Sequence, residues 1–283
     1  MRKVCSVVLS GLLMLTLILT GTGCKNGKPA SSNQTKLSVV TTSTDIADIV
    51  EDVGGDKVAV VNIIPPGQCP GHFDLKTNSL QMLEKASLFF MHDYDNEMFT
   101  DKLIKSVGNT KLQKVVIQNE QQTLMLPTRR LEGIAQVTTA LTKADSGNAS
   151  AYQAAAAELS DKTTQIAEQQ KERLNKAGAG QLKVLVAGYQ LEFAKWAELK
   201  VIGVFPPDIS ANKTKELIDL GQKEGASLVI DNLQTPNKTA AVGITKELDV
   251  PEISVSNFPG GLDGTDKWAD SFTKNVDLLL AHC

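Results

Sequence analysis

The sequence has few of the residues that carry most catalytic and metal-binding chemistry, since its 283 residues include only three histidines and four cysteines. It contains no glycine-rich phosphate loop and no dinucleotide-binding fingerprint, which excludes the common nucleotide-dependent enzymes. Aromatic residues make up only 5% of the chain. No basic stripe with interleaved aromatic residues occurs, so we expect no nucleic acid as a partner. These absences predict a protein that is not an enzyme.

The apolar content is nevertheless sufficient for one large domain or for two lobes with separate cores, because 42% of the residues are hydrophobic and 22% are charged. The four cysteines do not indicate a disulfide scaffold. Cys5 lies in the apolar leader and Cys24 directly after it, which leaves Cys69 and Cys283. Export would allow these two to pair.

The first residues have the pattern of a bacterial export signal. A short positive segment precedes residues 4–19, which are almost wholly apolar and too few for a stable membrane span. Small residues then lead to Cys24, as at a lipoprotein processing site, so we expect a signal peptide over residues 1–23 and a lipid anchor on Cys24. Ordinary cleavage that leaves a free protein is the alternative. Residues 24–36 are polar and are expected to form a flexible tether.

Strand-like and helical patterns alternate along the rest of the chain. Apolar, β-branched runs predict buried strands, and apolar residues at helical spacing between them predict helices. The expected strands cover residues 37–42, 58–64, 87–91, 115–117, 182–187, 200–204, 228–230 and 252–255. The expected helices cover residues 45–52, 148–176, 192–197, 213–224, 238–247 and 267–280, with one more from residue 78 or 79. This order predicts an α/β fold with parallel sheets, in which ligands lie beyond the carboxyl ends of the strands.

One segment differs from this alternation. Residues 148–176 contain no glycine or proline and have only a narrow apolar stripe, which predicts a helix roughly 43 Å long. We expect an N-terminal lobe over residues 37–147, a rigid linking helix over 148–177 and a C-terminal lobe over 178–283. An ordinary surface helix is the alternative for the long segment.

Several short motifs occur in a fixed order along nearly the whole mature chain. They are Val39–Ser43, Asp45–Val50, Gly54–Val58, Pro65–Gln68, Lys200–Gly203, Gln234 with Pro236, and Gly261–Asp266. Together they resemble the zinc/manganese solute-binding lipoproteins of ABC importers. The resemblance implies two pseudo-symmetric lobes joined by one long helix, with the ligand in the cleft between them. It also implies an ABC permease and an ATPase as partners.

The resemblance further implies a metal site of three histidines and one carboxylate, but this sequence does not supply those ligands. A gapless match places Gly71 at the first histidine, with His72 one residue later. The second histidine would fall near residues 123–125 and the third near 187–189, and neither range contains a histidine. The carboxylate position is occupied by Ser256. The ligand set of the family therefore does not carry over.

The chain's own residues predict a different metal site. His72 and His92 each follow an expected strand, and Cys69 precedes His72 in a Cys-Pro-Gly-His turn that could direct both side chains to one point. Asp231 follows a strand of the second lobe. A thiolate, two imidazoles and a carboxylate suit zinc or another soft transition metal. A buried thiol beside a surface histidine is the alternative. Cys69 and His72 could in principle form the nucleophile and base of an enzyme, but the sequence offers no third group that would orient the base, so we expect no catalytic role for them.

A second group of candidates favours another kind of ligand. Arg129 and Arg130 lie close to the position of the family's second histidine, and paired arginines suit an anion. Tyr189 and Gln190 follow a strand and could form hydrogen bonds with an organic group. Together these four residues favour an anionic metal chelate or a small organic molecule. A solvated helix start is the alternative for the two arginines.

The sequence therefore predicts an extracytoplasmic, lipid-anchored and monomeric protein that captures a ligand for an ABC importer. A transition metal ion such as zinc is the first expectation for the ligand. A receptor for an anionic metal chelate or a small organic molecule is the alternative, and a surface adhesin or metal chaperone is a further one.

Overall fold

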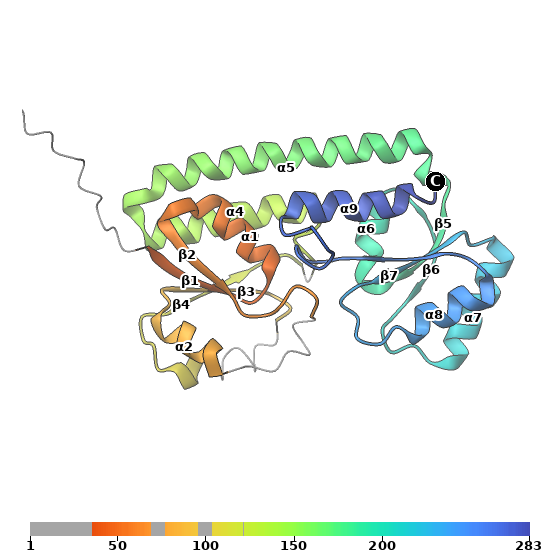
Figure 1. Ribbon diagram of the computed structural model, residues 1–283, viewed down its shortest axis with the longest axis horizontal. Coiled ribbons are helices and arrows are strands. Elements are labelled where there is room, and N and C mark those ends of the chain that lie inside the picture. The colour runs from red at the N-terminus through yellow and green to blue at the C-terminus, as the bar shows by residue number, and fades with distance from the viewer. Residues whose placement is uncertain (1–35, 69–76, 96–103, 121) are drawn as a thin grey trace, which may run out of the picture. The chain divides into compact units, whose positions relative to one another are not determined.

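Two four-stranded sheets, both entirely parallel, organise the chain (Figure 1). The computed structural model describes residues 36–68, 77–95, 104–120 and 122–283. The first sheet contains β1 (Leu37–Thr41), β2 (Val58–Asn62), β3 (Leu88–His92) and β4 (Gln113–Ile117). The second contains β5 (Lys183–Ala187), β6 (Lys200–Phe205), β7 (Leu228–Asn232) and β8 (Glu252–Val255). Both sheets lie in one compact unit, Thr35–Cys283.

The two sheets have the same internal order, which makes the two lobes pseudo-symmetric. The strand order is β2-β1-β3-β4 in the first and β6-β5-β7-β8 in the second, so the first strand of each lobe pairs with the second and third. In an open parallel sheet this order reverses the direction of winding beside the first strand, and the reversal leaves a crevice at the carboxyl ends of the strands. Each lobe therefore presents a crevice of the same kind.

Helices cover both sheets, and the interior strands are buried. All five residues of β3 and of β7 are buried, as is typical of parallel strands covered on both faces. The helices of the first lobe are α1 (Thr44–Gly54), α2 (Thr77–Lys85) and α4 (Pro127–Ala144). Those of the second are α6 (Leu191–Trp196), α7 (Ala211–Glu224), α8 (Thr239–Leu248) and α9 (Trp268–Leu280).

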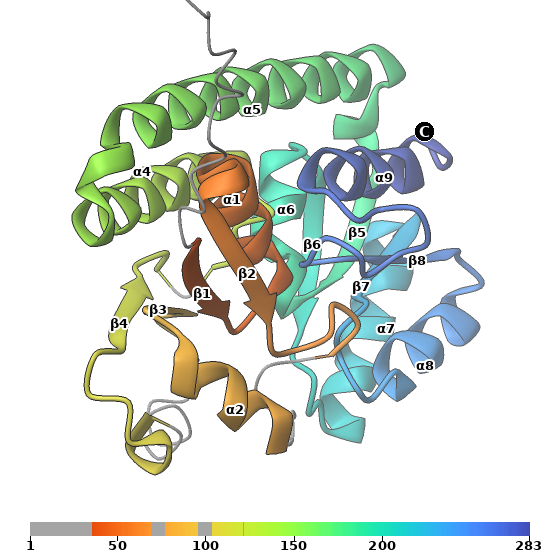
Figure 2. The ribbon, with the colours of Figure 1, turned by 60° about the vertical axis from the view of Figure 1, so that its left-hand side comes forward.

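The long helix α5 (Ala149–Ala177) has 29 residues and links the two lobes. Its first half places Tyr152 and Ala156 in the apolar core of the first lobe. Its second half places Leu174 in the core of the second lobe, with Ile166 packed against it. It accordingly runs alongside α1 and α4 and then alongside α9 (Figures 1 and 2). It ends at Gly178, whose φ of 75° is the left-handed conformation that favours glycine after a helix.

The expected fold class, an α/β protein with two parallel-sheet lobes and a long linking helix, is confirmed. Every expected strand is present, with ends that differ by one or two residues from those predicted. The sequence reasoning missed α4, although Ile134, Val137 and Leu141 have helical spacing and are buried. Among the described residues, no helix combines the length and apolar character needed to cross a membrane.

Candidate ligand site

A cavity of about 830 Å³ lies where strand ends of the two sheets come together. The first lobe contributes Tyr94, Gln122, Thr123 and Leu126 to its described lining. The second lobe contributes Gly188, Tyr189, Glu192, Phe193, Pro206, Pro207, Asp208, Asn232, Gln234, Thr235, Pro236, Asn237, Asn257 and Phe258. Nearly all of these residues end or follow a strand. The volume is in the range of cavities that hold drug-sized molecules.

The positions at which the family resemblance places metal ligands coincide with this cavity. Thr123 and Gly188, at the second and third histidine positions, both line it. Ser256, at the carboxylate position, is buried next to the lining residue Asn257, and its Oγ accepts a hydrogen bond of 2.9 Å from Nε2 of Gln234. Two of the four positions therefore lie at the cavity, and neither carries a histidine. The lining that the structure describes includes no histidine, cysteine, lysine or arginine.

Tyr189 and Gln190 take different parts in this site. Tyr189 lines the cavity and keeps 58% of its surface exposed. Gln190 is buried, and its Nε2 donates at 2.8 Å to Oδ1 of Asn232 and at 2.8 Å to Oδ1 of Asn257. Both asparagines line the cavity, so Gln190 orients residues of the lining. The prediction that Gln190 contacts the ligand directly stays untested.

His92 is completely buried at the end of β3 and forms its hydrogen bonds within the first lobe. Nε2 lies 2.8 Å from Oγ of Ser43 and 3.1 Å from Oδ1 of Asp45. Nδ1 lies 2.9 Å from Nδ2 of Asn119. The ring also stacks on Tyr94, a lining residue, with the ring centroids 4.5 Å apart. His92 therefore supports the cavity wall through Tyr94, and both of its nitrogens are engaged.

The charges of this buried pair stabilise each other. Burial opposes ionisation of Asp45, but the His92 imidazole and the hydrogen bonds from Ser43 and from the Ile46 N–H outweigh it, so the pKa of Asp45 is lowered. Burial alone would likewise lower the pKa of His92, but the Asp45 carboxylate raises it above its ordinary value. Because both ring nitrogens have partners, His92 would have to leave one of them before it could bind a metal ion.

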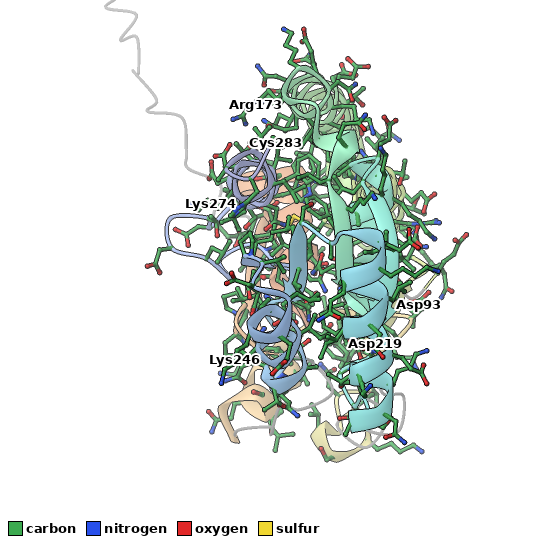
Figure 3. The ribbon with its side chains drawn as sticks, turned by 90° about the vertical axis from the view of Figure 1, so that its right-hand side faces the viewer. Asp93, Arg173, Asp219, Lys246, Lys274 and Cys283 are labelled. Carbon is green, nitrogen blue, oxygen red and sulfur yellow. The ribbon has the colours of Figure 1, made fainter. Side chains whose placement is uncertain are left out.

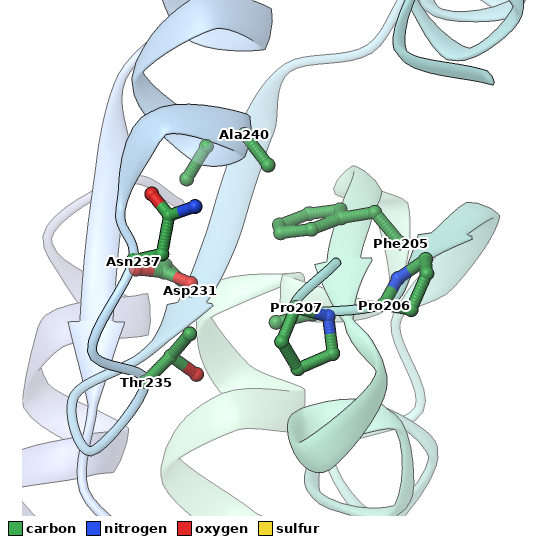
Figure 4. Close-up of a pocket in the computed structure, with 9 residues that line it drawn as sticks. Phe205, Pro206, Pro207, Asp231, Thr235, Asn237 and Ala240 are labelled. Atoms are coloured by element: carbon green, nitrogen blue, oxygen red, sulfur yellow. The ribbon is translucent and has the colours of Figure 1, made fainter. Parts of the chain in front are cut away.

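Asp231 forms an ion pair with Lys238 and, in the part of the chain that the structure describes, shares no partner with His92. It is buried, and Nζ of Lys238 lies 2.8 Å from its Oδ2. Asp231 borders a small hollow formed with Phe205, Pro206 and Pro207 (Figure 4). Among the described residues, no three histidine, cysteine, aspartate or glutamate side chains are grouped so that they could hold a metal ion. His92 and Asp231 are therefore not brought into one described site.

The paired arginines do not face the cavity, contrary to the sequence expectation. Arg130 is 1% exposed, and its Nη2 lies 2.7 Å from Oδ2 of Asp48. The Arg129 guanidinium forms ion pairs with Glu120 and Glu132. Neither arginine lines the cavity within the described part of the chain. Arg130 points away from the cavity because α4 begins at Pro127 and its first turn directs this side chain inward against α1.

Three predicted residues lie outside the described residues, namely Cys24, Cys69 and His72. The lipid anchor and the Cys-Pro-Gly-His part of the predicted metal site therefore stay predictions. Cys283 is an exposed free thiol.

Several lining residues were missed by the sequence reasoning. Phe193, Phe258 and Asp208 line the cavity. The two phenylalanines cannot ligate a metal ion, and the Asp208 carboxylate was not among the expected ligands. Asp208 and the preceding Pro206-Pro207 pair directly follow β6, and Phe258 follows β8 by three residues. A search at every strand end for aromatic as well as polar residues would have found most of them.

Two pseudo-symmetric α/β lobes, one linking helix and a cavity at the strand ends define the class of two-lobed solute-binding proteins. A family model described as "Zinc-uptake complex component A periplasmic" (ZnuA) matches residues 39–281, and the chain belongs to this family. The family is one of uptake components and not of enzymes.

Sequence relatives among curated proteins match a shorter stretch. The metal ABC transporter substrate-binding lipoprotein SsaB of Streptococcus sanguinis is 34% identical over 101 residues, which are 34% of this chain and 32% of the relative. The manganese ABC transporter substrate-binding lipoprotein PsaA of Streptococcus pneumoniae is 30% identical over 116 residues, 39% of this chain and 36% of the relative. The matches thus span about a third of the length of these relatives.

Solved structures show the same fold over most of the chain. A crystal structure of ZnuA has a TM-score of 0.74 at 16% identity and covers 87% of this chain and 99% of that one. The solute-binding protein FpvC of Pseudomonas aeruginosa, solved in complex with Mn2+, has a TM-score of 0.74 at 19% identity, covering 87% and 98%. Because these identities are low, the likeness establishes the architecture alone.

Proposed function

We propose that the protein is the extracytoplasmic ligand-capture component of an ABC importer and that its ligand occupies the cavity at the strand ends. Membership of a family of uptake components supports this role. The relatives named above are substrate-binding lipoproteins of metal ABC transporters. On this proposal a permease and an ATPase are the partners, and a monomer is attached to the membrane through a lipid on Cys24.

The single observation that carries the choice of ligand is the chemistry of the cavity lining. The cavity measures about 830 Å³ and its described lining contains no histidine or cysteine. An isolated transition metal ion would be held by such side chains at about 2.0 to 2.3 Å, whereas the described lining offers aromatic rings, prolines and amides, with Glu192 and Asp208 as its two carboxylates. The lining therefore favours an organic molecule or a metal held within an organic chelate.

A direct metal ion is the second candidate function. The family description names zinc uptake and a relative's name specifies manganese. On this alternative, Cys69 and His72 hold the ion, and His92 and Asp231 would have to leave the partners described above. His72→Ala and Cys69→Ser should then abolish metal stoichiometry, and His282→Ala should leave it unchanged, because His282 follows the last helix at the chain end.

Native mass spectrometry of protein purified without chelators separates the two candidates. An added mass of several hundred daltons, lost on denaturation, is expected for the organic or chelated ligand. An added mass equal to one metal ion, lost in both variants, would instead establish the direct metal site.

The membrane attachment is tested separately. The Cys24→Ala form should appear in the soluble fraction, since stable attachment requires acyl chains. A variant that stays in the membranes as firmly as the parent would contradict the anchor.

A further inference from the structure

We propose that the cavity selects a bulky, weakly hydrated organic cation, such as a quaternary ammonium compound or a delocalised aromatic cation; this proposal rests on the function proposed above. Three properties of the lining support it: the sign of its charge, the placement of its aromatic rings and the state of its amide oxygens.

The described lining carries only negative charge. Glu192 and Asp208 are its two ionisable carboxylates, and no lysine, arginine or histidine lines the cavity in the described part of the chain. Glu192 pairs with Lys195 at 2.7 Å, but both side chains are exposed and such a pair contributes little. Asp208 is exposed and takes part in none of the ion pairs formed between described residues. The described lining therefore attracts a cation and repels an anion.

Neighbouring cations do not reverse this sign, because each is paired with carboxylates, although Arg129 also donates to the Gln122 side chain and Lys238 to the carbonyl oxygen of Asn232. Arg129 lies near Gln122 but pairs with Glu120 and Glu132. Nζ of Lys238 lies 2.8 Å from Oδ2 of Asp231. The anionic ligand expected from the paired arginines thus has no positive partner in the described lining.

Four aromatic residues belong to the described lining. Tyr94, which the stacked His92 ring holds in place, comes from the first lobe, and Tyr189 comes from the second. Phe193 and Phe258 add two buried rings. A cation over an aromatic face is attracted by the electron-rich ring, and the attraction grows when water is excluded. Tyr189 keeps 58% of its surface exposed, so a ring is available at the opening.

Each side-chain amide oxygen of the described lining already accepts a hydrogen bond from the protein, which favours a cation that brings few donors. Gln190 donates to Oδ1 of both Asn232 and Asn257. The remaining lining amides likewise accept from the protein: Gln122 from Arg129, Gln234 from the Asn257 N–H, and Asn237 from the Thr239 N–H. A primary ammonium would bring three donors that need acceptors. A quaternary or delocalised cation brings few or none and loses little hydration on entry.

The test uses a matched set of probes on the full mature protein by isothermal titration calorimetry. Choline is the cation, 3,3-dimethylbutan-1-ol is its uncharged isostere and 3,3-dimethylbutanoate is the anion, with benzyltrimethylammonium as a larger cation. We expect both cations to bind, and choline to bind about tenfold more tightly than its neutral isostere, a ratio within the range of one or two cation–π contacts. Equal or tighter binding of the neutral or anionic probe overturns the proposal, and so does the failure of both cations to bind.

Matched variants locate the effect. Tyr189→Leu and Asp208→Asn should each weaken binding of benzyltrimethylammonium about five- to tenfold. Asp219→Asn removes a carboxylate of α7 that pairs with Lys215 on the same helix and should leave binding unchanged (Figure 3). Cation binding that neither cavity variant alters would contradict the proposed site.

Native mass spectrometry distinguishes a failure of the cation proposal from a failure of the organic-ligand proposal. A captured neutral or anionic organic molecule would contradict only the cation proposal, whereas a single bound metal ion would contradict an organic ligand of any charge.

Discussion

Nε2 of His92 lies 3.1 Å from Oδ1 of Asp45, and both side chains are completely inaccessible to solvent. The pair joins the end of β3 to the first turn of α1, and Oδ2 of Asp45 also accepts from the Leu124 N–H at 3.3 Å. Leu124 lies next to the lining residue Thr123. A buried ion pair thus supports the first-lobe wall of the cavity.

The first prediction concerns the pH dependence of stability. The lowered pKa of Asp45 contributes stability that is complete above the unfolded carboxyl value of about 3.9 and is lost as the pH falls. The raised pKa of His92 contributes stability that is complete below about 6.5 and is lost as the pH rises through the folded value. The pair therefore stabilises most between about pH 4 and 6.5.

Urea unfolding of the parent and of Asp45→Asn across pH 3 to 9 measures this contribution. The difference in the free energy of unfolding should be about 3 kcal/mol within that window, since the variant leaves a buried imidazole without its anion. The difference should shrink on both sides of the window. A difference that does not vary with pH would show that the pair is uncharged in the folded protein.

The second prediction separates the two adjacent arginines. Arg130 is buried between Asp48 and the Trp268 ring, whose centroid is 4.8 Å from the guanidinium carbon. Arg130→Ala leaves Asp48 without its buried partner and should lower the free energy of unfolding by about 3 to 5 kcal/mol. Arg129→Ala loses two pairs to exposed glutamates and one hydrogen bond to Gln122, and should cost less than about 1 kcal/mol.

Ligand binding provides the second readout for the arginines. Arg129→Ala should keep its affinity for cationic probes, because the Arg129 charge is paired with Glu120 and Glu132. A loss of binding in Arg129→Ala with unchanged stability would restore the anionic-ligand interpretation.

The third prediction tests packing between β6 and α7. A Cβ on Gly203 would lie 2.7 Å from Cδ2 of Leu185 and of Leu217, both buried. Gly203→Ala should therefore destabilise the protein by about 1 to 3 kcal/mol. Gly243 lies inside α8 with nothing within 4 Å of an added Cβ. Gly243→Ala should stabilise it by about 0.5 to 1 kcal/mol. Thermal unfolding should show shifts of opposite sign, and equal shifts would contradict this packing.

The fold was predictable because its signals are local. The β5 run and the β7 run are apolar and β-branched, and the long α5 segment has no residue that breaks a helix. Helix α4 was missed because its pattern is mixed: two arginines and a glutamate occupy its first turns, and burial of Arg130 depends on Asp48, 82 residues earlier in the chain.

The site was predictable in position but not in chemistry. Strand ends and the family motifs located Thr123, Gly188 and Tyr189 at the cavity. The Gln190 side chain points toward two asparagines, and the Arg130 side chain points toward α1. Both directions depend on tertiary contacts that cannot be predicted from the spacing of residues along the sequence. His92 was predicted as a metal ligand on its position at a strand end, and its partner Asp45 lies 47 residues away.

The last prediction concerns motion between the lobes. Nε1 of Trp268, at the start of α9, donates at 3.0 Å to the carbonyl oxygen of Met125, which precedes α4. Met125 and Leu126 also belong to the apolar core of the second lobe. Because first-lobe residues are built into the second core and α5 links both, the lobes should move little when ligand binds.

Small-angle scattering of protein as purified, and again after unfolding and refolding have removed the ligand, should give the same radius of gyration. Trp268→Ala removes one of several contacts between the lobes and should make the refolded form expand. Trp196→Ala, which packs against Phe272 within the second lobe, is the matched control and should not expand it. A clear drop in radius on ligand binding in the parent would contradict a rigid linking helix.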